Sequence, residues 1–175
     1  DYTGGGCPHI LAEPQRTNVN TDSQDFSKSF YIKDSGVSVG DTNFVSPSGE
    51  SNATQIEVNN NGRIYANVTS DTYASSVFIK AGTFAYFKFG GNVDLVAGTF
   101  SGGTIESFGN GWFRITKQYT GNRPFQIQAY PDGTYSSHTT DGNYYIWGSQ
   151  IEVGSYATSY IPNFGTALGV TRNQD

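Results

Sequence analysis

The chain has 175 residues, enough for one domain with a sizeable core, and only 14% of them are charged. Its formal net charge of −5 argues against a nucleic-acid partner, because binding to phosphates needs clustered Lys and Arg. No apolar run approaches the ~20 residues that a membrane-spanning helix needs, so we expect no membrane insertion.

The composition points to β-structure. Twelve Tyr, twelve Phe and twenty-two Gly, with many Thr, Val and Ile, are typical of short strands joined by glycine turns. Patterns of apolar residues between turn residues predict strands, in chain order, over residues 10–12, 30–33, 37–39, 43–45, 54–58, 63–68, 73–81, 84–89, 93–100, 103–108, 112–120, 123–130 and 143–153.

Turn signals separate these strands. Residues 59–62 read Asn-Asn-Asn-Gly and should close a hairpin, and Asn110-Gly111 should turn the chain into the strand that follows, because Asn and Gly tolerate positive φ. Many short strands with frequent turns predict an all-β fold, a two-sheet antiparallel β-sandwich. We expect residues 1–175 to form a single domain, with residues 1–9 as an extended N-terminal arm.

The strand over residues 112–120 carries the first candidate binding residues. Phe113 and Ile115 share one face, and Trp112 and Arg114 share the other. If the first pair points into the core, the second pair must face a groove or a partner. Sugars present apolar C–H faces between hydroxyls, so a Trp beside an Arg suits a sugar site. The alternative is that Trp112 covers the core at an edge and Arg114 pairs with a carboxylate.

The strand over residues 143–153 carries a second set. Tyr145 and Trp147 alternate with Tyr144 and Ile146, and the alternation does not say which set is buried. Trp147 is therefore either a core or subunit-interface residue or a platform for a ligand, and the core interpretation is preferred.

Residues 131–142 form a long polar loop, which suits recognition on a rigid scaffold or, alternatively, a solvated connection. Tyr135 and His138 are its candidate ligand-binding residues. Asp132 and Asp141, together with backbone carbonyls, form a candidate structural calcium site, because calcium takes six to eight oxygen ligands. The loop has no EF-hand spacing.

Catalysis is weakly indicated. A glycosidase needs two carboxylates about 5–10 Å apart across a cleft, and Asp94, Glu106 and Glu152 are isolated candidates without a shared motif. Neither His9 nor His138 lies in a recognisable Ser-His-Asp setting. We therefore expect that the domain is not an enzyme and requires no cofactor.

Six motifs spread over almost the whole chain fit one known pattern. The chain resembles a module found near the C-terminus of bacteriophage tail-fibre, head-fibre and other virion proteins and in some bacterial surface proteins, which is similar to the concanavalin-like, jelly-roll carbohydrate-binding modules. The motifs are DYTGGGCP at residues 1–8, LAEPQRTN at 11–18, NGWFR at 110–114, YIWGSQIE at 145–152, GSYATSYIP at 154–162 and VTR at 170–172.

The resemblance implies a jelly roll that forms the C-terminal part of a longer protein, on a virion surface or on an extracellular or bacterial cell surface. It implies a non-catalytic domain that binds a host cell-surface polysaccharide and assembles with other virion fibre subunits, often as a homotrimer. It marks Trp112, Arg114, Trp147 and Gln150 as ligand-binding candidates.

Two other functions stay open. The domain could be a structural assembly module that trimerises a virion fibre through its aromatic residues. It could also be a carbohydrate-binding module cut from a polysaccharide-degrading enzyme, in which case a catalytic domain would be encoded upstream.

Overall fold

Fifteen β-strands and no helix make up the described part of the chain, residues 13–174 of a computed structural model. The expected N-terminal arm (residues 1–9) and the expected strand over residues 10–12 lie outside the described residues. Within residues 13–174, no helix is long and apolar enough to cross a membrane.

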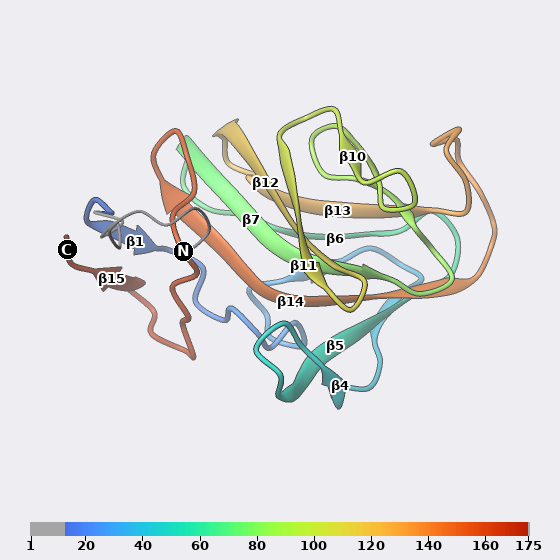
Figure 1. Cartoon of the computed structure of the whole chain (residues 1–175), viewed down its shortest axis with the longest axis horizontal. Helices are drawn as coiled ribbons and strands as arrows, with labels where there is room; N and C mark the ends of the chain where they lie inside the picture. The colour runs from blue at the N-terminus through green and yellow to red at the C-terminus, as the bar shows by residue number, and fades with distance from the viewer. Residues whose placement is uncertain (1–12, 175) are drawn as a thin grey trace, which may run out of the picture.

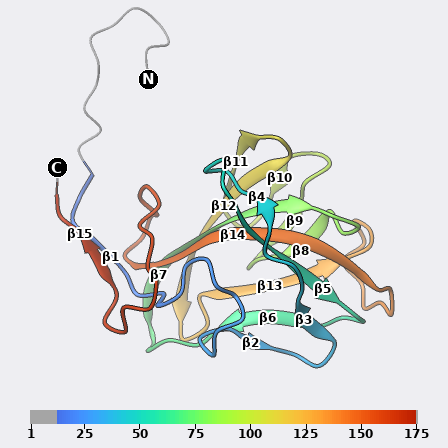
Figure 2. The same cartoon turned by 90° about the horizontal axis from the view of Figure 1, so that it is seen from below.

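Two antiparallel sheets pack face to face as a β-sandwich, which confirms the predicted fold class (Figure 2). The larger one, called the large sheet, contains nine strands: β1 (Arg16–Asn18), β3 (Val37–Val39), β4 (Phe44–Val45), β5 (Ser51–Val58), β7 (Asp71–Ala81), β11 (Thr104–Gly109), β12 (Trp112–Gly121), β14 (Gly142–Val153) and β15 (Val170–Arg172). The small sheet contains six: β2 (Ile32–Lys33), β6 (Arg63–Ala66), β8 (Tyr86–Lys88), β9 (Asn92–Asp94), β10 (Thr99–Phe100) and β13 (Phe125–Tyr130).

The order of strands shows how the chain builds both layers at once. The large sheet runs β11-β12-β7-β14-β1-β15, with β5 also pairing with β14 and carrying β3 and β4, and the small sheet runs β10-β9-β8-β13-β6-β2. Strands β5 to β8, and again β12 to β14, alternate between the two sheets. This alternation gives the sandwich its jelly-roll-like character. The two ends of the described chain meet where β1 pairs with β15 (Figure 1).

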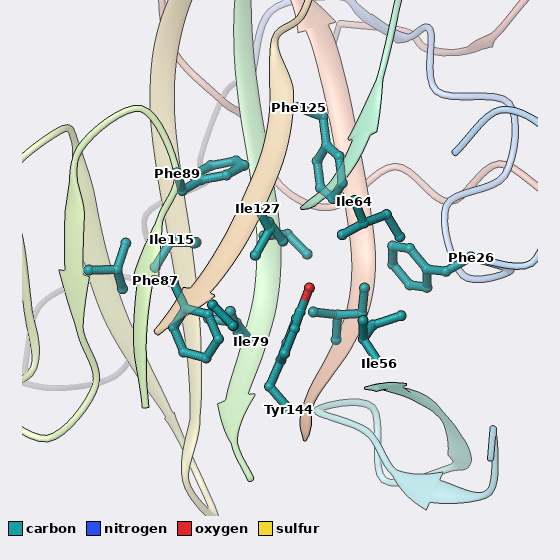
Figure 3. Packing of buried hydrophobic residues seen from close by; sticks show 14 of the residues in the cluster. Phe26, Ile56, Ile64, Ile79, Phe87, Phe89, Ile115, Phe125, Ile127 and Tyr144 are labelled. Carbon is teal, nitrogen blue, oxygen red and sulfur yellow. The ribbon is translucent and has the colours of Figure 1, made fainter. Parts of the chain in front are cut away.

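The turn at residues 59–62 is present, but the predicted hairpin is wrong. Asn60 has a positive φ of 66°, as the sequence pattern requires. However, β5 pairs with β3, β4 and β14, whereas β6 pairs with β13 and β2. Ile56 of β5 and Ile64 of β6 both lie in the core between the sheets (Figure 3). The turn is therefore an arch that carries the chain from one sheet to the other.

The core lies between the sheets and is rich in aromatic and β-branched side chains (Figure 3). Ile115 of β12 is fully buried there and Phe113 packs against it, so the predicted inward face of β12 is confirmed. Ile56 and Val58 of β5 are also buried, as their alternation with polar residues predicts.

A β-bulge in β14 changes which side chains face outward. The pairing of β14 with β7 shifts between Trp147 and Gln150. Before the bulge, Ile146 points into the core between the sheets, and after it Ile151 does so. Trp147, Gln150 and Glu152 consequently share the outer face of the large sheet, although strict alternation would separate Trp147 from the other two.

Gly148 makes this bulge possible, so we expect Gly148→Ala to destabilise the protein by about 2–4 kcal/mol. Its φ is +59°, and an added Cβ would lie 3.1 Å from Phe78 and 3.3 Å from the ring of Tyr160. Gly109→Ala is the matched control, because Gly109 has φ +77° but open space around an added Cβ. Urea unfolding should show the smaller cost of about 1–2 kcal/mol for the control. Equal costs for the two variants would contradict the packing part of this account.

Candidate functional site

The outer face of the large sheet is covered by the chain itself. A second hydrophobic cluster forms there from Ala53, Phe78, Trp112 and Trp147, with Phe44, Tyr145 and Tyr160 packed against it. Two segments supply the cover: β4, and a stretch of residues 154–164 that follows β14, called the tail segment. The exposure of each candidate residue on this face depends on these two segments.

Trp112 and Arg114 lie on the predicted face, but only Arg114 reaches solvent: it is half-buried and lines a hollow of about 380 Å³ together with Glu106. Trp112 is only 2% exposed, and its indole Nε1 donates to the backbone oxygen of Val45 at 3.1 Å. Arg114 Nη2 donates to the backbone oxygen of Thr158 at 2.6 Å and to Ser76 Oγ at 3.1 Å. Burial lowers the pKa of Arg114, which the carboxylate of Glu152 partly counteracts. The expectation of an exposed Trp-Arg platform is therefore wrong for Trp112, which β4 covers, whereas Arg114 does face a hollow.

Trp147 and Gln150 hold the tail segment in place. Trp147 is 6% exposed and packs on Tyr160, with ring centroids 4.8 Å apart. Gln150 is fully buried, and its Oε1 accepts from the backbone N–H of Ile161 at 2.5 Å. The core interpretation of Trp147 is thus the one that the structure favours, and neither side chain is free to meet a ligand.

The loop over residues 131–142 folds back onto the sandwich. Tyr135 donates from its hydroxyl to the backbone oxygen of Val93 at 3.0 Å, and His138 donates from Nε2 to the backbone oxygen of Ala129 at 2.9 Å. Both side chains are half-buried. They fasten the loop to the small sheet rather than stand at an exposed tip, which is a correction to the sequence-based expectation.

Within residues 13–174, the fold brings no third His, Cys, Asp or Glu side chain to the candidate calcium residues. Asp132 Oδ1 accepts from the backbone N–H and the hydroxyl of Thr134, and these hydrogen bonds lower the pKa of Asp132. Asp141 is exposed. No group of three or more His, Cys, Asp or Glu side chains that could hold a metal occurs among residues 13–174. The fold therefore adds no support for a calcium site at Asp132 and Asp141.

A groove elsewhere on the described chain was missed from the sequence. This groove has a volume of about 690 Å³. It forms where the loop before β2, the β4–β5 region and the tail segment meet. Its lining residues are Asp22, Gln24, Asp25, Ser27, Lys28, Thr42, Asn43, Ser51, Asn52, Thr54, Asn163 and Phe164.

A buried network of polar side chains fixes two walls of the groove. Asn18 Nδ2 donates to the backbone oxygen of Ile161 at 2.7 Å and to Ser23 Oγ at 2.9 Å. Ser23 Oγ in turn accepts from the backbone N–H of Asn163 at 3.1 Å. Asn20 Oδ1 accepts a hydrogen bond from the backbone N–H of Asp22 at 3.0 Å. The loop and the tail segment are thereby locked together before any ligand arrives.

The side chains of the groove suit a polyhydroxylated ligand. Carboxylates, amides and hydroxyls line it, and the side chains of Thr42, Asn43 and Ser51 are exposed to solvent there. Phe164 is 73% exposed and supplies the one aromatic ring of the lining. Such a surface combines donors and acceptors for hydroxyls with an apolar face for sugar C–H groups.

Comparisons with known proteins do not place the chain in a family. No protein-family model matches it, and a search of curated proteins finds no significant match. The chemistry of the groove is therefore the basis on which a function is assigned.

Proposed function

We propose that this domain is a non-catalytic carbohydrate-binding domain and that the groove holds the glycan. The observation that carries the proposal is the lining of the groove: amide, hydroxyl and carboxylate side chains around the exposed ring of Phe164. Neutral polar side chains match sugar hydroxyls, and the ring of Phe164 offers an apolar face to the C–H groups of the same sugar.

The biological setting follows from the resemblance to the virion-fibre module. In that setting the domain recognises a polysaccharide on a host cell and sits on the virion surface, attached to other fibre subunits. A bacterial surface protein is the other setting that the resemblance offers. The groove supports either setting equally, because both require a pre-formed glycan site on a rigid scaffold.

Binding should depend on the groove and not on Trp112. Isothermal titration against glycans selected on an array is expected to show Phe164→Ala and Asn43→Ala each weakening binding about tenfold or more, which corresponds to ~1.4 kcal/mol. Tyr156→Ala is the matched control, because Tyr156 is a 53% exposed aromatic residue that does not line the groove. Absence of binding to every glycan, or wild-type affinity in both groove variants, would contradict the proposal.

Structural assembly is the second candidate function. Phe164, the last residue of the tail segment, is 73% exposed, and Leu168, four residues later, is 94% exposed. Exposed apolar side chains of this size suit contacts with sister chains in a trimer. Light scattering with Leu168→Asp decides the matter: a trimer that this variant dissociates supports assembly, whereas a monomer that binds glycan supports recognition. A module cut from a polysaccharide-degrading enzyme would be revealed by a catalytic domain encoded upstream.

A further inference from the structure

Another hollow lies on the outer face of the large sheet, around Lys80. Lys80 of β7 stands directly opposite Trp112 of β12 on one side and Tyr145 of β14 on the other. Side chains opposite one another in adjacent strands have Cβ atoms about 5 Å apart, so the side chain of Lys80 lies between the rings of Trp112 and Tyr145. Phe44 adds a third ring, with its centroid 4.6 Å from that of Tyr145.

These residues line a cleft that continues past Val45. The first part, about 320 Å³, is lined by Phe44, Val45, Lys80, Trp112 and Tyr145. A second part, about 210 Å³, shares Val45, Lys80 and Trp112 and extends to the turn between β11 and β12. We call the two parts together the Lys80 cleft.

The charge of the Lys80 cleft differs from that of the rest of the protein. The chain carries a net charge of −5, yet no Asp or Glu lines either part of the cleft. Within residues 13–174, Lys80 takes part in no salt bridge. An ammonium group without a carboxylate partner, on a surface framed by aromatic rings, is a site for an anionic group.

The cleft adjoins the groove through β4. Asn43 lines the groove and the next residue, Phe44, lines the cleft. Consecutive Cα atoms are about 3.8 Å apart, so only one strand separates the two hollows. A ligand of several linked rings can therefore reach from one hollow into the other, whereas a single small molecule would occupy only one.

We infer that the glycan bound by this domain is acidic and that the Lys80 cleft holds one of its carboxylate-bearing sugars. This inference rests on the proposed glycan-binding function and specifies its substrate class. The Nζ of Lys80 donates a charge-assisted hydrogen bond to the sugar carboxylate, and the rings of Tyr145 and Phe44 contact the C–H face of the same sugar. Trp112 forms only the wall, because it is 2% exposed.

The test compares acidic oligosaccharides with their uncharged counterparts. The probes are oligosaccharides of galacturonate, alginate and hyaluronate, each also in a carboxyl-reduced form, titrated into the wild type and into Lys80→Gln. We expect at least one acidic form to bind about tenfold or more tightly than its reduced form, and Lys80→Gln to remove that difference. Lys88→Gln is the control, because Lys88 lies on the small sheet, and it should keep the difference.

Failure of this inference can be told from failure of the proposed function. If acidic and reduced forms bind equally, and Phe164→Ala still weakens both, the groove binds glycans but the acidic assignment is overturned. If Lys80→Gln weakens both forms equally, Lys80 has no role specific to a carboxylate and the inference is also overturned. If no probe or array glycan binds, both proposals fail. A cleft covered by a second copy of the chain would appear as a dimer that Lys80→Glu disrupts, and this result would likewise overturn the inference.

Discussion

Glu152→Gln is expected to destabilise the domain by about 2–4 kcal/mol, although it changes a single side-chain atom. Glu152 is fully buried on the outer face of β14. Its Oε2 accepts from the backbone N–H of Thr158 at 3.0 Å and from Gln150 Nε2 at 2.5 Å, and its Oε1 accepts from Thr158 Oγ1 at 2.6 Å. In a glutamine, an NH2 group would replace one of the two carboxylate oxygens and would face the N–H or O–H groups that now donate to that oxygen.

The lower stability of Glu152→Gln should appear first as local opening of the tail segment. Thr158 donates two hydrogen bonds to Glu152, and its backbone oxygen accepts one from Arg114 Nη2. Glu152→Gln would also remove a negative charge that favours the charged form of Arg114. Limited proteolysis should accelerate near Tyr156, and urea unfolding should give the lower free energy. Glu57→Gln is the control, because Glu57 is exposed and accepts a single hydrogen bond within the described residues, from Ser38 Oγ at 3.2 Å. Unchanged stability of Glu152→Gln would refute the role of the carboxylate.

The alternation of apolar residues predicted most of the strands because each strand has one face in the core. On β12, Phe113 and Ile115 point inward as expected. Alternation specifies the face of a sheet, but not what covers that face. Trp112 is on the outer face, yet its partner Val45 lies 67 residues away in the sequence. No local pattern indicates that contact, so a buried Trp112 could not be told from an exposed one.

The bulge in β14 and the short strands β1 and β15 were not predicted, for related reasons. Gly148 shifts the alternation within a strand that otherwise reads regularly, so Gln150 and Glu152 could not be assigned to the face of Trp147. Strands β1 and β15 have three residues each and include polar side chains at most positions. They form by long-range pairing, β15 with β1 and β1 in turn with β14, which local composition does not indicate.

The groove could not be predicted because three distant segments build it. Asp22, Asn43 and Asn163 belong to stretches whose polar residues are typical of turns and loops. The motifs that carry the resemblance to the virion-fibre module contain none of the residues that line the groove. Asn110-Gly111 makes the turn before β12 with positive φ at both residues, and Gln150 holds the backbone of the tail segment at Ile161. In this chain those motifs build the scaffold, and the groove lies outside them.

Lys117→Met is the second change from which a large effect is expected, and it should stabilise the protein at pH 7. Lys117 follows Ile115 on the inward face of β12 and is 4% exposed. Its Nζ lies 4.6 Å from the ring centroid of Phe89 and 4.9 Å from that of Tyr119, and it takes part in no salt bridge within residues 13–174. Desolvation by burial lowers the pKa of Lys117 from 10.5 to about 8.

The pH dependence follows from this lowered pKa. Below about pH 8 Lys117 is protonated in both states, and the folded state bears the cost of a buried charge. Between about pH 8 and 10.5 the folded state has released the proton while the unfolded state retains it, so the free energy of unfolding rises with pH. The full rise attributable to the desolvation of Lys117 is about 3 kcal/mol.

A methionine has nearly the same shape without the charge, so Lys117→Met should gain about 2–3 kcal/mol at pH 7 and lose the rise above pH 8. Urea unfolding at intervals between pH 7 and 9 measures both effects, and this range ends about one pH unit below the ordinary pKa of tyrosine. Lys28→Met is the matched control, because Lys28 is an exposed lysine whose pair with Asp25 contributes little to stability. A rise with pH that persists in Lys117→Met would assign it to another group, and a destabilised variant would mean that the contacts with Phe89 and Tyr119 outweigh the cost of burying the charge.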